Sequence, residues 1–140
     1  MSRQLAETLI LLGGCVHFCI LIASALVPRL LDWRTNLAPL QPFLRRLFWV
    51  YGAFIVLTIV CFGLLSVGHA KELVEGTPLA RGVCVFIAIF WIARLGVQFF
   101  VFDARPFLTK WWIRLGYHGL TVIFTLLPVP YVLVAVGWVK

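Results

Sequence analysis

The sequence predicts an all-α integral membrane protein: one four-helix bundle with short loops, forming a single transmembrane domain over residues 1–140. Of the residues, 63% are hydrophobic and 12% charged, against about 45–50% and about 25% in soluble domains. Disorder is excluded because it requires low hydrophobicity. Four runs of about 20 residues, the length that spans a bilayer, carry at most one charge each. Their lack of polar–apolar alternation excludes a transmembrane barrel.

The first helix is expected at about residues 5–27, because Leu9 to Val27 contains no charged residue. Ala23, Ser24 and Ala25 resemble a signal-peptide cleavage site. The preceding segment is not a typical positive n-region, since Arg3 is offset by Glu7. We therefore expect a permanent membrane span.

The segment 28–46 is expected to lie at the cytoplasmic membrane surface rather than to span the bilayer. Its apolar residues are spaced as in an amphipathic turn or short helix, at Leu30, Leu31, Trp33 and Leu37. Prolines at positions 28, 39 and 42 should interrupt any longer helix, because proline lacks the backbone N–H donor.

The remaining helices are expected at about 47–68, 79–102 and 112–137. Thr77 and Pro78 form a plausible N-cap and first helical position for the third helix. Within that helix, the run Gly82 to Phe102 holds a single charge, Arg94, whereas the long apolar runs of the other three helices hold none. Pro128 and Pro130 should bend the fourth helix.

The distribution of basic residues predicts the orientation. Seven of the 12 lie in two loops, at Arg29, Arg34, Arg45, Arg46, Arg105, Lys110 and Arg114. Four lie on the other side, at Arg3, Lys71, Arg81 and Lys140. Because cytoplasmic loops are enriched in Lys and Arg, we expect both termini outside, in a multi-pass protein of a bacterial inner membrane. The net charge of +7 then reflects topology and contact with anionic lipid, and nucleic-acid binding is not expected.

Polar residues within the spans predict a pocket in the cytoplasmic half. A central Arg costs about 2.5–3.5 kcal/mol on insertion scales and usually faces a bundle interior or a water-filled cavity. Gln98 follows Arg94 by four residues and shares its helical face. Arg114, His118, Thr121 and Thr125 form a second stripe at helical spacing. We expect a ligand or lipid to be held by five of these residues: Arg94, Gln98, Arg114, His118 and Thr121. In the alternative interpretation, the Arg94 side chain extends to the membrane surface and the threonine hydroxyls donate to backbone carbonyls of their own helix.

His17 and His118 lie on different predicted helices and are candidate axial ligands of a b-type haem. Residue counting places them about 15 Å and 5 Å from the inner boundary, a mismatch that disfavours one shared iron. A quinone or lipid pocket using His118 and Arg94 fits equally well. The cofactor therefore stays unassigned.

The four cysteines lie within predicted spans and form no C-x-x-C pair or zinc-site spacing. Small residues at spacing four let helices approach closely, so a packing role is expected. The residues concerned are Cys15, Cys19, Ala23, Cys84 and Ala88. No metal site and no catalytic constellation is predicted.

Three functions remain open. The favoured one is a non-catalytic membrane subunit that packs in a larger complex or homo-oligomer. The second is a small oligomeric channel or transporter with Arg94 and His118 lining the path, in which Arg94→Ala should change flux. The third is a haem- or quinone-binding redox protein, in which His17→Ala or His118→Ala should remove visible absorbance.

Overall fold

A computed structural model describes residues 1–101 and 111–139, and these residues form helices connected by short turns, without strands. The helices are α1 (Arg3–Leu30), α2 (Trp33–Asn36), α3 (Pro42–Gly68), α4 (Ala70–Val74), α5 (Pro78–Phe100), α6 (Trp111–Leu126) and α7 (Pro128–Ala135). Four segments are long and apolar enough to cross a membrane: α1, α3, α5 and the continuous stretch Trp111–Ala135. The predicted all-α class is thus confirmed for the described residues, and four helical segments have the length and apolarity that were predicted for the spans.

The prolines shorten the helices less than the sequence predicts. Pro28 lies inside α1, which continues to Leu30 instead of ending near residue 27. Pro42 occupies the first helical position of α3, where a missing N–H costs nothing, so this helix begins five residues before the predicted 47. Of the segment 28–46, only the four-residue α2 and the turns beside it separate the two long helices.

Two local predictions about the later helices hold. The Thr77 side chain accepts a hydrogen bond from the Ala80 backbone N–H at 3.2 Å and so caps α5. Pro128 divides the last span into α6 and α7. Leu127, at the junction, keeps helical dihedral angles and donates to the Ile123 carbonyl at 2.8 Å, so the span bends without breaking. The predicted end of the third helix at residue 102 lies outside the described residues.

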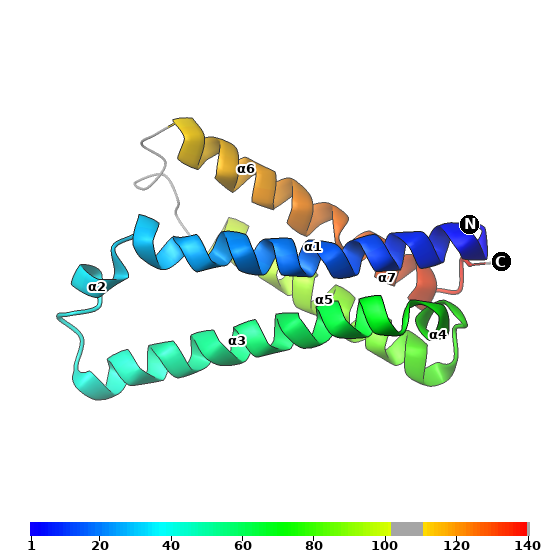
Figure 1. Cartoon of the computed structure of the whole chain (residues 1–140), viewed down its shortest axis with the longest axis horizontal. Coiled ribbons are helices and arrows are strands. Elements are labelled where there is room, and N and C mark those ends of the chain that lie inside the picture. Colours follow the sequence, from blue (N-terminus) through cyan, green and yellow to red (C-terminus); the bar gives the residue numbers. More distant parts are fainter. Residues whose placement is uncertain (102–110, 140) are drawn as a thin grey trace.

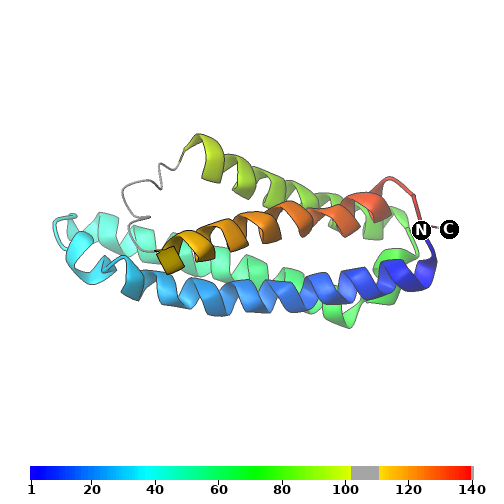
Figure 2. The ribbon, with the colours of Figure 1, turned by 90° about the horizontal axis from the view of Figure 1, so that it is seen from above.

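The helices pack as two pairs, α1 against α3 and α5 against α7, while α6 lies less closely against α5 and diverges from it (Figure 1). Both termini lie at the same end of the bundle, beside α4 (Figure 2). There the Met1 ammonium donates to the Trp138 carbonyl at 3.1 Å. We call this the terminal end. The opposite end, which carries α2 and the arginines of 28–46, is called the basic end.

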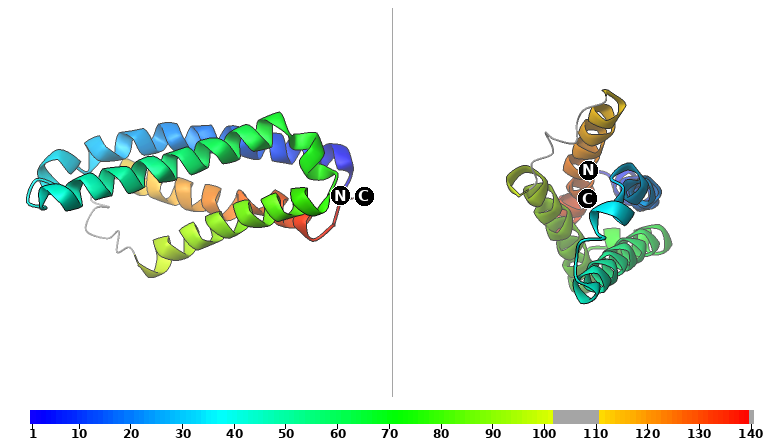
Figure 3. Two further views of the ribbon diagram at one scale, coloured as in Figure 1. Left: turned by 90° about the horizontal axis from the view of Figure 1, so that it is seen from below. Right: turned by 90° about the vertical axis from the view of Figure 1, so that its left-hand side faces the viewer.

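Packing within the bundle is uneven along its length. The buried apolar residues lie mainly towards the terminal end, on α1 up to Ile20, α3 from Ile59, α5 up to Trp91, and from Phe124 onwards. Among the described residues, none of Pro42–Thr58 is buried, and Gln98 is the one buried residue of α5 beyond Trp91. Figure 3 shows α3, α5 and α6 diverging towards the basic end. We therefore distinguish a packed half from an open half.

Glycines allow the closest helix contact in the packed half. A Cβ added at Gly14 on α1 would lie 3.0 Å from Ser66 Cβ and 3.1 Å from the Val67 backbone nitrogen on α3. Likewise, a Cβ at Gly63 on α3 would lie 2.8 Å from the Phe18 ring. Small residues are how membrane helices approach closely, so these two positions join α1 to α3.

Candidate functional site

The core contains a polar side chain, His17, which is fully buried on α1. Its Nδ1 lies 2.6 Å from the Gly13 carbonyl oxygen, one helical turn earlier. Its Nε2 accepts a hydrogen bond from the indole N–H of Trp91 on α5 at 3.0 Å. Because an indole N–H only donates, Nε2 must be the unprotonated nitrogen, and Nδ1–H donates to Gly13. Both ring nitrogens of a neutral His17 are therefore satisfied within the protein.

A second buried hydrogen bond joins the other two spans. The hydroxyls of Ser66 on α3 and Tyr131 on α7 lie 2.7 Å apart, and both residues are fully buried. The Tyr131 ring also meets the His17 ring edge-on, with centroids 6.1 Å apart. Together these side chains connect all four spans in the packed half. Their polar atoms hold helices together, which is a structural role.

This geometry bears on the haem hypothesis. An iron atom at His17 Nε2 would have to displace the Trp91 N–H, and one at Nδ1 would have to displace the Gly13 carbonyl. His118 is exposed on α6, and its ring lies edge-on to the neighbouring Tyr117 at 5.6 Å. The haem and quinone hypotheses stay predictions, and the histidine pair does not form a ready-made ligand set.

Three of the residues predicted to line a polar pocket lie where α5 meets α6, and we call them the α5–α6 polar stripe: Arg94, Gln98 and Thr121. Gln98 is 5% exposed, and its Nε2 donates to Thr121 Oγ1 at 2.5 Å. The Thr121 hydroxyl in turn donates to the Tyr117 carbonyl at 2.8 Å. The stripe thus links two helices at the start of the open half.

Arg94 is half-buried and lies on the same face of α5, one turn before Gln98. Its guanidinium carbon is 5.3 Å from the centre of the Phe124 ring on α6. A cation over an aromatic face gains about 0.5–2 kcal/mol, depending on how far it is desolvated. The contact with Phe124 therefore ties this charge on α5 to α6, within the membrane-length region.

The structure does not bring all predicted site residues to this stripe. Arg114 and His118 are exposed on the first turns of α6. Thr125 donates to the Thr121 carbonyl at 2.8 Å, which is the helix back-bonding expected of a membrane threonine. Gln98 and Thr121 are joined directly, and Arg94 lies one turn before Gln98 and contacts Phe124. The loop residues Arg105 and Lys110 lie outside the described residues.

The predicted small-residue positions divide into two groups. Cys84 and Ala88 are buried in the core of α5. Cys15 and Cys19 are exposed and Ala23 is half-buried, so other residues bring α1 to α3. Within the described part of the chain, the face of α1 that packs is the one with Gly13, Gly14 and His17. Helical spacing would also have found Trp91, which follows the buried Cys84 by seven residues.

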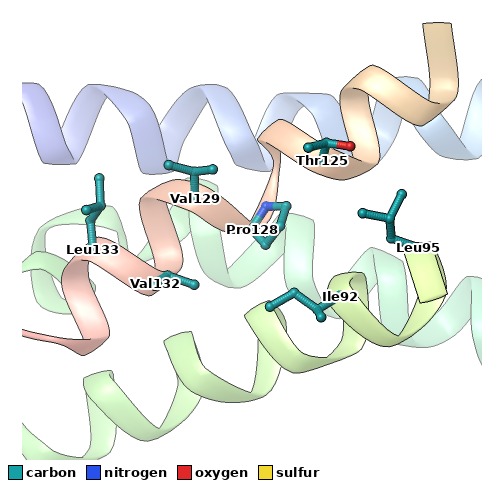
Figure 4. Close-up of a pocket in the computed structure, with 7 residues that line it drawn as sticks. All are labelled: Ile92, Leu95, Thr125, Pro128, Val129, Val132 and Leu133. Carbon is teal, nitrogen blue, oxygen red and sulfur yellow. The ribbon is translucent and has the colours of Figure 1, made fainter. Parts of the chain in front are cut away.

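An apolar cavity of about 290 Å³ lies at the proline bend between α5 and the last span. Figure 4 shows its lining, with Ile92 and Leu95 on α5 facing Pro128, Val129 and neighbouring residues of the last span. Thr125 is the one polar residue of this lining. Because its hydroxyl is already bonded within α6, the cavity suits an acyl chain or another apolar group.

No protein-family model, no curated protein and no solved structure matches this chain. Its class therefore rests on its own four membrane-length apolar helices, which make it a multi-pass membrane protein.

Proposed function

We propose that this protein is a non-catalytic integral membrane subunit, whose open half receives another membrane chain or a second copy of itself. The observation that carries the proposal is that the helix faces which are buried in the packed half are exposed where they continue into the open half. A bundle that buries its inward faces over only half its length offers a ready contact surface for a further helix.

The face of α3 shows this most clearly. Ile59, Phe62 and Ser66 lie on one face of α3 and are buried against its neighbours. Ile55 precedes Ile59 by one turn on that face, yet it is 52% exposed. Gly52, two turns before Ile59, has no atom within 4 Å of where its Cβ would lie. Such a small residue on an inward face would let a partner helix approach closely.

The α5–α6 polar stripe lies at the boundary between the two halves. Charged residues within membrane spans usually face the interior of a bundle or assembly. Arg94, held by Phe124 and flanked by Gln98, suits an anionic group inserted from the open half. A lipid phosphate, a cofactor head group or a partner carboxylate each has this chemistry.

The orientation and location belong to the same proposal. The basic end carries most of the Lys and Arg residues of the loops, and such loops favour the cytoplasmic side. We therefore place both termini outside and the open half towards the cytoplasm of a bacterial inner membrane. The anionic lipids of that surface would interact favourably with the arginines of 28–46.

Native mass spectrometry on protein released gently from its own membrane tests the proposal. We expect an assembly heavier than one 15.8 kDa chain. If the stripe anchors the partner, Arg94→Gln should lower the fraction of that assembly. The matched control Arg114→Gln removes an exposed charge at the same end and should leave the fraction unchanged. A single chain carrying lipids only would contradict the proposal.

A further inference from the structure

A second site, not part of the α5–α6 polar stripe, lies at the basic end on α1, α2 and α3. It is a pocket of about 360 Å³, within the usual range of small-ligand sites of about 300–1,000 Å³. Three arginines and two tryptophans dominate its lining: Arg29, Arg34, Arg45, Trp33 and Trp49. We call this the basic pocket.

The turn between α1 and α2 builds the pocket. Asp32 takes a left-handed conformation with φ of 42°, which a short polar residue tolerates and which redirects the chain after α1. Asn36 fixes the turn, because its side-chain amide donates to the Leu31 carbonyl at 2.7 Å. As a result Trp33 meets Trp49 of α3 edge-on, with ring centroids 5.6 Å apart. Arg34 thereby joins Arg45 at one pocket.

The charge of the basic pocket is unbalanced. Among the described residues, the ion pairs lie at the terminal end, between Arg3 and Glu75 and between His69 and Glu72. The basic pocket has no carboxylate in its lining. Arg45 also lies in the first turn of α3, where the helix dipole contributes further positive charge. Three like charges at one pocket favour an anionic ligand.

We propose that the basic pocket binds the phosphate of an anionic membrane phospholipid. Guanidinium groups match phosphate oxygens in bidentate geometry, and three arginines from different turns can surround one head group. Tryptophans at the ends of membrane spans contact the interfacial region, so the two rings would seat the glycerol part. Basic pockets between span ends are the kind of site that holds such head groups. The ligand is a lipid rather than a free phosphate, because the pocket opens where the spans end.

The experiment counts bound lipid by native mass spectrometry in zwitterionic detergent, with phosphatidylglycerol or phosphatidylcholine added. The test variant is Arg34→Gln with Arg45→Gln. The matched control, Arg46→Gln with Arg114→Gln, removes the same charge at the same end from residues outside the lining. All four side chains are exposed, so both variants should fold, which circular dichroism checks.

We expect wild-type protein to bind phosphatidylglycerol in preference to phosphatidylcholine. The test variant should lose roughly tenfold or more in affinity and the control less than about threefold. Equal losses in both variants would show binding to overall surface charge and would overturn the proposal. Equal binding of the two lipids would do the same. Full competition by soluble glycerol phosphate at equal concentration would assign the pocket to a free phosphate instead of a lipid.

Discussion

Gly14 offers a sharp test of the helix contact that holds the packed half together. In Gly14→Ala the new Cβ would lie 2.7 Å from Val67 Cγ2, 3.0 Å from Ser66 Cβ and 3.1 Å from the Val67 nitrogen. The Val67 side chain is 42% exposed and can rotate away. The other two atoms are fixed to the backbone of α3. Restoring an ordinary contact of about 3.4 Å therefore requires α1 and α3 to separate by about 0.4 Å.

Such overpacking costs about 1–3 kcal/mol. Alanine also gains up to about 1 kcal/mol over glycine in helix propensity, which would mask part of the cost. Gly82→Ala on α5 has the same gain without a clash, since no atom lies within 4 Å of its Cβ. The difference in unfolding free energy between the two variants therefore measures the cost of the clash.

The assay is equilibrium unfolding in mixed micelles, followed by far-ultraviolet circular dichroism. We expect Gly14→Ala to unfold with a free energy about 1–3 kcal/mol lower than that of Gly82→Ala. The same displacement should weaken the hydrogen bond of Ser66, which neighbours the clash. If the two variants agree within about 0.5 kcal/mol, α1 and α3 do not approach as closely as described.

Three further predictions follow from the polar groups and the ends of the bundle. Tyr131→Phe and Ser66→Ala should each lower the free energy of unfolding by about 0.6 kcal/mol and at most about 1.7 kcal/mol. Because the two hydroxyls share one hydrogen bond, the double variant should lose little more than either single variant. Unfolding titrations of all three variants measure these losses, and strictly additive losses would contradict the prediction. In a cysteine-free background, an impermeant maleimide should label Asn36→Cys from the cytoplasmic side and Glu72→Cys from the outside, and the reverse pattern would invert the orientation. Arg3→Ala should change stability by less than about 0.5 kcal/mol, because its pair with Glu75 is exposed on both sides; a loss above 1 kcal/mol would contradict this.

The sequence alone was sufficient to predict the four membrane-length helices and the positions of several of their ends. Long uncharged runs require helices in a bilayer, since only helices satisfy their own backbone there. Thr77 and Pro78 identified a cap because their chemistry is local. The bounds at Pro28 and Pro42 were less predictable, because proline is tolerated near helix ends and the pattern does not say where an end lies.

The uneven packing and the details of the site were not predictable in this way. Whether Ile55 is covered depends on how helices diverge, which no local pattern encodes. Helical spacing correctly placed Gln98 on the face of Arg94, but the partner Thr121 had to be found in space. The sequence identified His17 as a candidate ligand. It could not show the hydrogen bond from Trp91, because that residue lies 74 positions away in the chain.

The most direct test of the proposed subunit role is photocrosslinking in the native membrane. A benzophenone amino acid at Ile55 would project from the inward face of α3 in the open half. The same amino acid at Leu64, which is 59% exposed in the packed half, serves as the control that faces the surroundings. We predict crosslinks from position 55 to a protein chain and crosslinks from position 64 to lipid. Lipid adducts alone at position 55 would contradict the proposal that another membrane chain fills the open half.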